Sequence, residues 1–219
     1  MATETITHAQ FHERARQWEN TTLRTELLLA GGAVVLAILG WAGIFRSDLA
    51  AIAVIGLGLV LGFQGGNVML RYTELLYDAG ATTNAHSAQV SRGITGELLA
   101  GLAGIVLGIL ALLQIVPMIL MAAAVITYGE TLLLTSHESM WLTPLGTENP
   151  AVQQLMRSIG MAAAGTQVLV GLAALVLGIL GLVGIAPITM ILVALLATSA
   201  SMLLRSSLVG GFLLDLLSM

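Results

Sequence analysis

Six apolar stretches are the feature of this sequence that most limits its fold. Each is close to the length of about 20 helical residues that crosses the hydrocarbon core of a bilayer. They do not show the alternating polar and apolar strands of about ten residues that are typical of membrane β-barrels. We therefore expect an all-α polytopic membrane protein whose transmembrane helices cover residues 25–45, 49–70, 97–116, 118–136, 166–185 and 188–208.

The composition agrees with lipid as the main surroundings. Charged residues make up 9% of the 219 residues and hydrophobic residues 57%, whereas an ordinary soluble domain carries roughly 25% charged residues. The chain therefore has too few charges to cover a water-facing surface. A net charge of −4 gives no basic surface for nucleic acid. The absence of cysteine excludes disulfides and thiolate ligands.

The stretches come in three pairs, and each pair is expected to form a helical hairpin. The break within a pair is short: Arg46-Ser47-Asp48 in the first, Pro117 in the second and Pro187 in the third. The expected organisation is an N-terminal arm (1–24), a membrane domain (25–208) with hairpins 25–70, 97–136 and 166–208, linkers 71–96 and 137–165, and a tail (209–219).

The three hairpins repeat one another. Equivalent positions are 71 residues apart between the first and second copies and 70 apart between the second and third. An even number of helices in each copy keeps the copies parallel, unlike the inverted repeats of many secondary transporters. The matched positions include a polar residue at the start of each first helix (Glu26, Glu97 and Gln167) and an isoleucine before each hairpin tip (Ile44, Ile115 and Ile185).

The arginines predict the topology. Only Arg46 lies at a hairpin tip, and the other seven lie on the side of the termini and linkers: Arg14, Arg16, Arg24, Arg71, Arg92, Arg157 and Arg205. Because positive residues remain on the cytoplasmic side of a membrane, we expect cytoplasmic termini in a bacterial-type inner membrane.

The polar segments are expected to form short amphipathic helices at the membrane surface. Residues 5–22 place Phe11 and Trp18 on one stripe, which favours an interfacial helix. We expect residues 71–78 to extend the second helix to near Gly80, a natural helix stop.

Further short helices are predicted in the linkers. One would be capped by Asn84 and run to Arg92, and another would be capped by Asn149 with Pro150 in its first position.

Small residues at a spacing of four predict close helix packing, because small side chains let helix backbones approach in lipid. One interpretation is packing within the chain. The other is a homo-oligomer or contact with another membrane protein, for which the row in the second stretch is the best candidate. The rows are Gly58, Gly62 and Gly66, then Gly104 and Gly108, and finally Ala174 and Gly178.

Polar residues at membrane depth are candidate transport residues, because ionisable groups are costly in lipid. Glu130, with Tyr128 beside it, is the most unusual. It is expected to act in proton or ion transfer, or to be protonated, paired with Arg92 or Arg157, or turned towards the interface. The set Glu26, Glu97 and Gln167 either complements exposed amides in the first helical turn or forms a polar ring at a cytoplasmic entrance.

No enzyme signature is present in the sequence. A nucleophile elbow, a phosphate-binding loop, paired carboxylates and zinc-ligand spacing are all missing. We therefore expect no catalytic residues, cofactor or metal.

Two segments resemble a known family. GIVLGILALLQIVP (104–117) and ALVLGILGLVGIAP (174–187) are similar to the repeat of the HdeD-type acid-resistance membrane proteins. The resemblance implies six helices in three hairpins with proline at the tips, and a stress-linked, non-enzymatic role without catalytic residues to transfer. The first hairpin departs from the pattern, because Arg46 stands at the proline position.

These features favour a non-catalytic membrane protein with a structural, assembly or stress-response role. It would contact the lipid bilayer and act through helix packing with itself, as a homo-oligomer, or with a larger membrane complex. The alternative is a small-solute transporter or proton channel that uses Glu130 and the entrance residues Glu26, Glu97 and Gln167.

Overall fold

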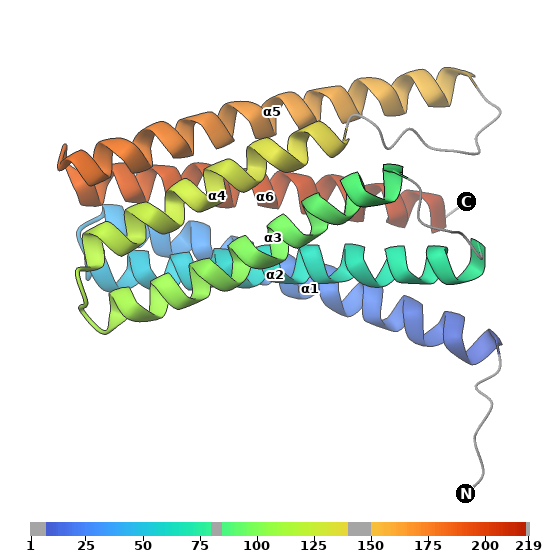
Figure 1. The fold of residues 1–219 in the computed structure, drawn as a ribbon, viewed down its shortest axis with the longest axis horizontal. Coiled ribbons are helices and arrows are strands. Elements are labelled where there is room, and N and C mark those ends of the chain that lie inside the picture. The colour runs from blue at the N-terminus through green and yellow to red at the C-terminus, as the bar shows by residue number, and fades with distance from the viewer. Residues whose placement is uncertain (1–7, 80–84, 140–149, 218–219) are drawn as a thin grey trace, which may run out of the picture.

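The computed structural model describes the backbone of residues 8–79, 85–139 and 150–217, and the side chains of residues 25–66, 96–136, 161–162 and 164–204. The described residues form six helices and no strand, which confirms the all-α prediction (Figure 1). The helices are α1 (His8–Trp41), α2 (Arg46–Ala79), α3 (Ala85–Leu112), α4 (Pro117–Ser139), α5 (Pro150–Val183) and α6 (Pro187–Leu217).

Four of these helices contain a segment long and apolar enough to cross a membrane. Within the described residues, α1 and α3 contain shorter apolar segments, Thr25–Trp41 and Gly96–Leu112. The four longer segments are Arg46–Gly66, Pro117–Ser136, Ala164–Val183 and Pro187–Leu204.

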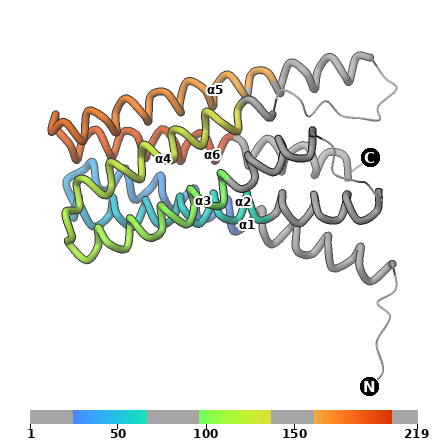
Figure 2. Tube along the Cα trace, in the orientation of Figure 1, coloured from blue at the N-terminus to red at the C-terminus, as the bar shows by residue number. Residues whose placement is uncertain are grey.

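The helices run alternately in opposite directions along the bundle. The three short connections, after α1, α3 and α5, all lie at one end of the bundle (Figures 1 and 2). The start of α1 and the end of α6 lie at the other end (Figure 1). The odd-numbered helices are therefore parallel to one another, and so are the even-numbered helices.

The three short connections share one backbone conformation. Each has a left-handed residue one or two positions after the helix, at Gly43 (φ 98°), Gln114 (φ 60°) and Gly184 (φ 90°). In the first, the Gly43 N–H donates to the carbonyl of Gly40 (3.1 Å) and the Ile44 N–H to that of Leu39 (3.3 Å). The same pair recurs from Gln114 to Ala111 and Ile115 to Leu110, and from Gly184 to Gly181 and Ile185 to Leu180.

This pattern is a Schellman cap, which closes the helix end and favours an apolar residue after the left-handed one. It accounts for the isoleucine found before each hairpin tip. A second left-handed residue follows at Phe45, Val116 and Ala186. The next helix then begins at Arg46, Pro117 or Pro187, and proline suits a first helical position because it has no N–H to leave unpaired there.

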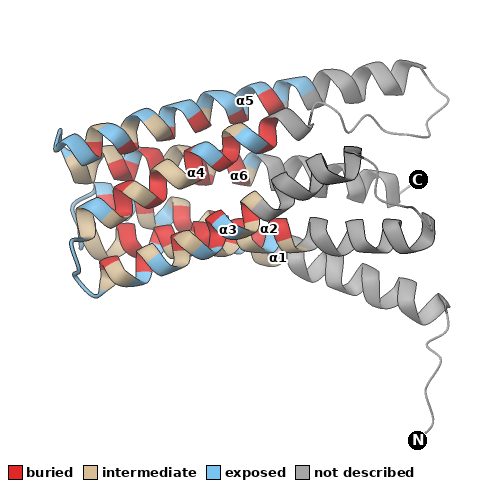
Figure 3. Cartoon of the chain, in the orientation of Figure 1, coloured by how far each residue is buried: buried red, intermediate tan, exposed pale blue. Residues whose placement is uncertain are grey.

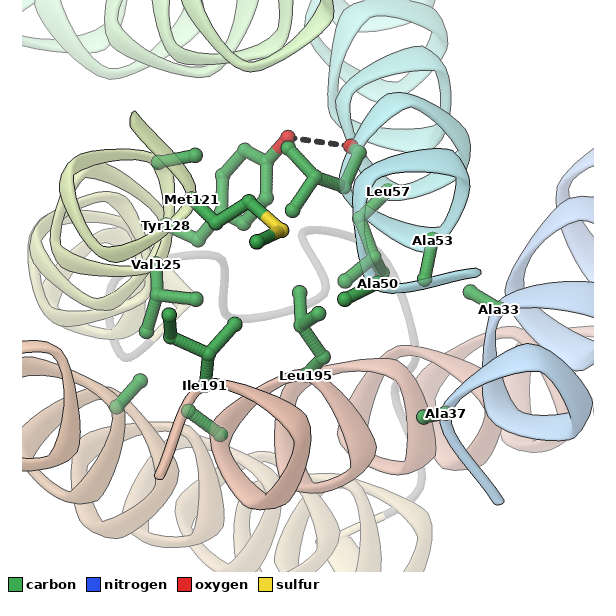
Figure 4. Close-up of a cluster of buried hydrophobic side chains, with 14 of the residues drawn as sticks. Ala33, Ala37, Ala50, Ala53, Leu57, Met121, Val125, Tyr128, Ile191 and Leu195 are labelled. Atoms are coloured by element: carbon green, nitrogen blue, oxygen red, sulfur yellow. Dashed lines mark hydrogen bonds between the residues drawn. The ribbon is translucent and has the colours of Figure 1, made fainter. Parts of the chain in front are cut away.

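The even-numbered helices form the centre of the bundle. Helices α2, α4 and α6 contact one another, and each odd-numbered helix contacts two of them: α1 lies against α6 and α2, α3 against α2 and α4, and α5 against α4 and α6. Figure 4 shows side chains of the three central helices turned towards one another.

The core lies among these central helices, at positions that are 71 residues apart between α2 and α4 and 70 apart between α4 and α6. The spacing along each helix alternates between four and three, as in the seam of a coiled coil. The side chains are at most 3% exposed, and Figure 3 shows buried residues facing the interior. The four sets are Ala50, Met121 and Ile191; Val54, Val125 and Leu195; Leu57, Tyr128 and Thr198; and Leu61, Leu132 and Met202.

The prediction of separate interfacial helices is wrong for the described backbone. Residues 8–22 belong to α1, residues 85–92 begin α3, and residues 150–159 begin α5. Each of these polar segments continues without interruption into the apolar segment of the same helix.

The resulting helices are longer than a bilayer core. Helices α1 and α5 have 34 residues each, which is about 51 Å of helix, against about 30 Å of hydrocarbon. The predicted extension of α2 is confirmed, since the helix ends at Ala79. The side chains of Phe11 and Trp18 lie outside those that the structure describes.

Candidate functional site

The three polar residues expected at a cytoplasmic entrance are all buried. Glu26 is 7% exposed, and Glu97 and Gln167 are each 5% exposed. They lie on α1, α3 and α5, and these helices do not contact one another in the described part of the chain. The structure therefore holds the three side chains at separate places instead of gathering them into a ring.

Gln167 differs from the two glutamates in its hydrogen bonding. Its side-chain oxygen Oε1 is buried and, among the described residues, has no hydrogen-bond partner. Glu26 and Glu97 each take part in an interaction. A buried acceptor without a partner lowers stability by about 1–3 kcal/mol, so Gln167 is a weak point of the fold.

Tyr128 lies in the core and joins two central helices. Its side chain is fully buried, and its hydroxyl donates a hydrogen bond to the backbone carbonyl of Val54 on α2 at 2.6 Å (Figure 4). Its hydroxyl also fills the space that a Cβ on Gly104 would need. Both contacts point to a packing role for this tyrosine.

Glu130 lies on the opposite side of α4 from Tyr128. Two positions along a helix correspond to a rotation of about 200°, so Glu130 is exposed while Tyr128 is buried. On the same side of α4, Leu134 lies one turn further along the helix and is 65% exposed, and Ile119 lies three turns earlier and is 54% exposed. The predicted pair of Glu130 and Tyr128 therefore does not form one site.

The expected partners of Glu130, Arg92 and Arg157, lie on α3 and α5, but their side chains lie outside those that the structure describes. The pairing of Glu130 with either arginine therefore stays a prediction.

Several hydroxyl groups are buried in the central helices. Among the described residues, Thr131, Thr135, Thr198 and Ser199 donate to carbonyls one turn earlier in their own helices. Thr131 donates to Thr127 at 2.8 Å, Thr135 to Thr131 at 3.0 Å, Thr198 to Ala194 at 2.9 Å and Ser199 to Leu195 at 2.6 Å. Such bonds satisfy the hydroxyls locally.

Glycine pairs bring α2 close to α3 and α4 close to α5. A Cβ on Gly58 would lie 2.7 Å from the carbonyl oxygen of Gly101, and a Cβ on Gly129 would lie 2.7 Å from that of Gly171. Gly58 and Gly129 are 71 positions apart, and Gly101 and Gly171 are 70 apart. The equivalent positions of α6 and α1 hold Ser199 and Ala30, both fully buried.

The same seams contain a second level of close contact. A Cβ on Gly108 would lie 3.1 Å from the carbonyl oxygen of Ala51, and a Cβ on Gly178 would lie 3.2 Å from that of Ala122. Ala174, also expected to pack, is fully buried. The predicted packing positions of the third and fifth helices therefore lie against other parts of this chain.

The glycine row of α2 is divided. Gly58 packs against α3. It is therefore not available for the contact with another subunit that was one interpretation of this row. Gly62 lies with its backbone nitrogen 2.5 Å from where a Cβ on Gly101 would stand, whereas a Cβ on Gly62 or Gly66 would meet nothing within 4 Å.

Sequence reasoning missed three of the four glycines in these pairs. Gly101, Gly129 and Gly171 do not stand in the rows that were recognised. The repeat offsets contain the signal, because Gly58 is 71 positions before Gly129 and Gly101 is 70 positions before Gly171.

A polar contact links two hairpin ends. The Gln114 side chain donates from Nε2 to Oδ1 of Asp48 at 3.1 Å. It connects the second hairpin tip to the start of α2 and lies far along the bundle from Glu130, so it belongs to the end of the structure and not to a transport site. No protein-family model, curated protein or solved structure matches this chain.

Proposed function

We propose that this chain is a six-span protein of a bacterial inner membrane, built from three repeated hairpins with cytoplasmic termini, and that it has a non-catalytic structural or assembly role. It would act by packing with itself or with other membrane proteins. A stress-associated role belongs to the same proposal and rests on the resemblance of residues 104–117 and 174–187 alone.

The recurrence of the same contacts supports the three-hairpin interpretation. The caps at Gly43, Gln114 and Gly184 share one hydrogen-bond pattern. The glycine seams of α2 with α3 and α4 with α5 match position by position. Unrelated helical pairs have no reason to agree at both the hairpin tips and the packing seams.

The close packing of side chains between α2, α4 and α6 is the main support for a role without conduction. Four successive sets of side chains between α2, α4 and α6 are at most 3% exposed, and most of them are apolar. A pathway for protons or small solutes needs polar groups or water along its length. The outward position of Glu130 also counts against the transporter alternative, because this carboxylate does not face the packed interior.

Flux measurements test this role. Purified protein in liposomes is expected to give a proton and solute leak no greater than that of protein-free liposomes. Native mass spectrometry in nanodiscs is expected to show an oligomer or a complex with another membrane protein. A flux well above the protein-free control that disappears in Glu130→Gln would overturn the proposal, as would a strictly monomeric protein without partners in native membranes.

The topology is tested by cysteine labelling, since the chain contains no cysteine of its own. A membrane-impermeant maleimide is expected to label Ala42→Cys, at a hairpin tip, in intact spheroplasts. Asp78→Cys should react only after lysis. Labelling of both positions from the same side would contradict the three-hairpin arrangement.

A further inference from the structure

We propose that the first hairpin tip binds the phosphate group of an anionic phospholipid through Arg46, with Trp41 and Phe45 at the edge of the acyl chains. The site lies at the tip end of the bundle, which is the end where the three short connections 42–45, 113–116 and 184–186 lie. This inference goes beyond the assembly role and rests on the proposed arrangement of six spans.

The connections at the tip end expose apolar side chains. Figure 3 shows this end of the bundle as largely exposed. Exposed apolar surface that extends over several segments is typical of a face that contacts a membrane or another protein. The large apolar side chains of the connections are between 49% and 74% exposed: Ile44, Phe45, Leu113, Ile115, Val116 and Ile185.

The length of the helices indicates lipid as the cover of this surface. Glu26 and Trp41 are 15 positions apart, which is about 22 Å of helix, and Glu97 and Leu112 have the same separation. A hydrocarbon core about 30 Å thick that begins at Glu26 therefore extends past Trp41 into the connection. The apolar tips then lie at the far edge of the acyl chains, next to the phosphate groups of that leaflet.

Arg46 brings a positive charge to this edge. The chain has no lysine, and the other seven arginines lie on the side of the termini and linkers. The Arg46 side chain is exposed and lies over the first connection, because its Nη2 and Nε atoms are 3.6 and 3.9 Å from where a Cβ on Gly43 would stand. Pro117 and Pro187 hold the equivalent positions, so we expect one such site, at the first tip.

The carboxylate nearest to Arg46 in the sequence is engaged elsewhere. Asp48 accepts a hydrogen bond at Oδ1 from Nε2 of Gln114, in the second tip, at 3.1 Å. Two positions along a helix correspond to a rotation of about 200°, so Arg46 and Asp48 leave α2 on opposite sides. The guanidinium of Arg46 is therefore open to an anion from outside the chain.

An anionic lipid matches both parts of the site. Trp41 and Phe45 are 62% and 74% exposed, and aromatic side chains are typical of the boundary between acyl chains and headgroups. A guanidinium binds a phosphate group with paired N–H donors. A soluble anion would leave the aromatic side chains uncovered, and the ammonium of a zwitterionic headgroup would compete with Arg46 for the phosphate.

The test measures how strongly brominated lipids quench the fluorescence of Trp41 in the full-length chain. Trp18→Phe and Trp141→Phe leave Trp41 as the single tryptophan. The vesicles contain equal parts of phosphatidylcholine and phosphatidylglycerol, and either one lipid or the other carries bromine on its acyl chains. The ratio of the two quenching constants gives the enrichment of phosphatidylglycerol beside Trp41, which is expected to be about five-fold and to disappear in Arg46→Gln.

A matched variant separates a site at Arg46 from a general attraction of anionic lipid to the tip end. Arg46→Gln with Pro117→Arg keeps the net charge of this end but moves it to the start of α4, which does not contact α1 in the described part of the chain. The enrichment beside Trp41 should be lost in this double variant. Sodium phosphate should reduce the wild-type enrichment no more than sodium chloride of equal ionic strength.

The proposal is overturned if Arg46→Gln or the double variant keeps the wild-type enrichment. Stronger displacement by sodium phosphate than by sodium chloride would also overturn it, because the ligand would then be a soluble anion. Equal quenching by both lipids in the wild type would remove the lipid site and leave the six-span arrangement intact. Failure of that arrangement is detected separately, by labelling of Ala42→Cys and Asp78→Cys from the same side.

Discussion

Gly104 and Tyr128 are matched in size, because the tyrosine hydroxyl occupies the space that a Cβ on the glycine would need. The same hydroxyl donates to the carbonyl of Val54 at 2.6 Å. The first hairpin has Ala33 and Leu57 at the equivalent positions, and the third has Ala174 and Thr198. Of the three combinations, the one with the smallest residue at the first position, Gly104, has the largest residue at the second, Tyr128.

Gly104→Ala is expected to lower the free energy of unfolding by about 1–3 kcal/mol, because overpacking forces the tyrosine from its place. Adding Tyr128→Leu recreates the combination of Ala33 and Leu57 and should recover part of the loss. Denaturant titration in mild detergent, followed by circular dichroism, measures both. Equal stability of Gly104→Ala and wild type would contradict the size matching.

Gly58→Ala should lower the free energy of unfolding more than Gly66→Ala does. A Cβ on Gly58 would press on the backbone of Gly101, whereas a Cβ on Gly66 meets nothing within 4 Å. We expect a loss of about 1–3 kcal/mol for the first and no loss for the second, since alanine favours a helix over glycine. Thermal unfolding of the two variants in the same detergent gives the comparison, and a larger loss for Gly66→Ala would be inconsistent with the α2–α3 seam.

Val116→Gly is expected to stabilise the second hairpin tip. Val116 has a left-handed backbone (φ 44°), which is strained for a β-branched side chain, and its side chain is 56% exposed. Relief of this strain should raise the free energy of unfolding by about 1 kcal/mol. The control is Ile115→Gly, which removes the apolar residue of the cap and should be destabilising; a loss of stability in Val116→Gly would contradict the strain.

Gln167→Leu is expected to raise the free energy of unfolding by about 1 kcal/mol, because it removes a buried oxygen that lacks a hydrogen bond. Glu97→Leu, at the equivalent position of the previous hairpin, should be destabilising because that carboxyl takes part in an interaction. Denaturant titration of the two variants tests the difference, and the opposite order would argue against the burial of Gln167 without a partner.

The sequence predicted the helices and their tips well, because both depend on local chemistry. Proline at the start of a helix, and isoleucine after a left-handed residue, act within a few residues of the chain. The helix ends at Trp41, Leu112 and Val183 therefore fall close to the expected turns.

The prediction of separate surface helices failed for a different reason. Polar composition indicates where a helix leaves the lipid but does not end it, and residues 8–22 contain no residue that breaks a helix. The length of α1, α3 and α5 is decided by backbone hydrogen bonds that continue through the polar segments.

The grouping of Tyr128 with Glu130 failed because sequence neighbours in a helix face different directions. Only the packing around α4 decides which of the two is buried, and that packing depends on distant residues such as Val54 and Gly104. The paired glycines were visible in the repeat offsets, but their contacts between helices required the arrangement of the bundle.

Because the three helix pairs belong to one chain, the sequence of each pair can change independently of the other two. A trimer of identical separate hairpins would place three tyrosines at the central position that Leu57, Tyr128 and Thr198 share, and a fully buried site has no room for three large rings. A single polypeptide enlarges one residue while its counterparts stay small, and it places a carboxylate on one flank without copying it to the others. Covalent linkage thus lets the chain carry a different residue at each of the three positions of one core level.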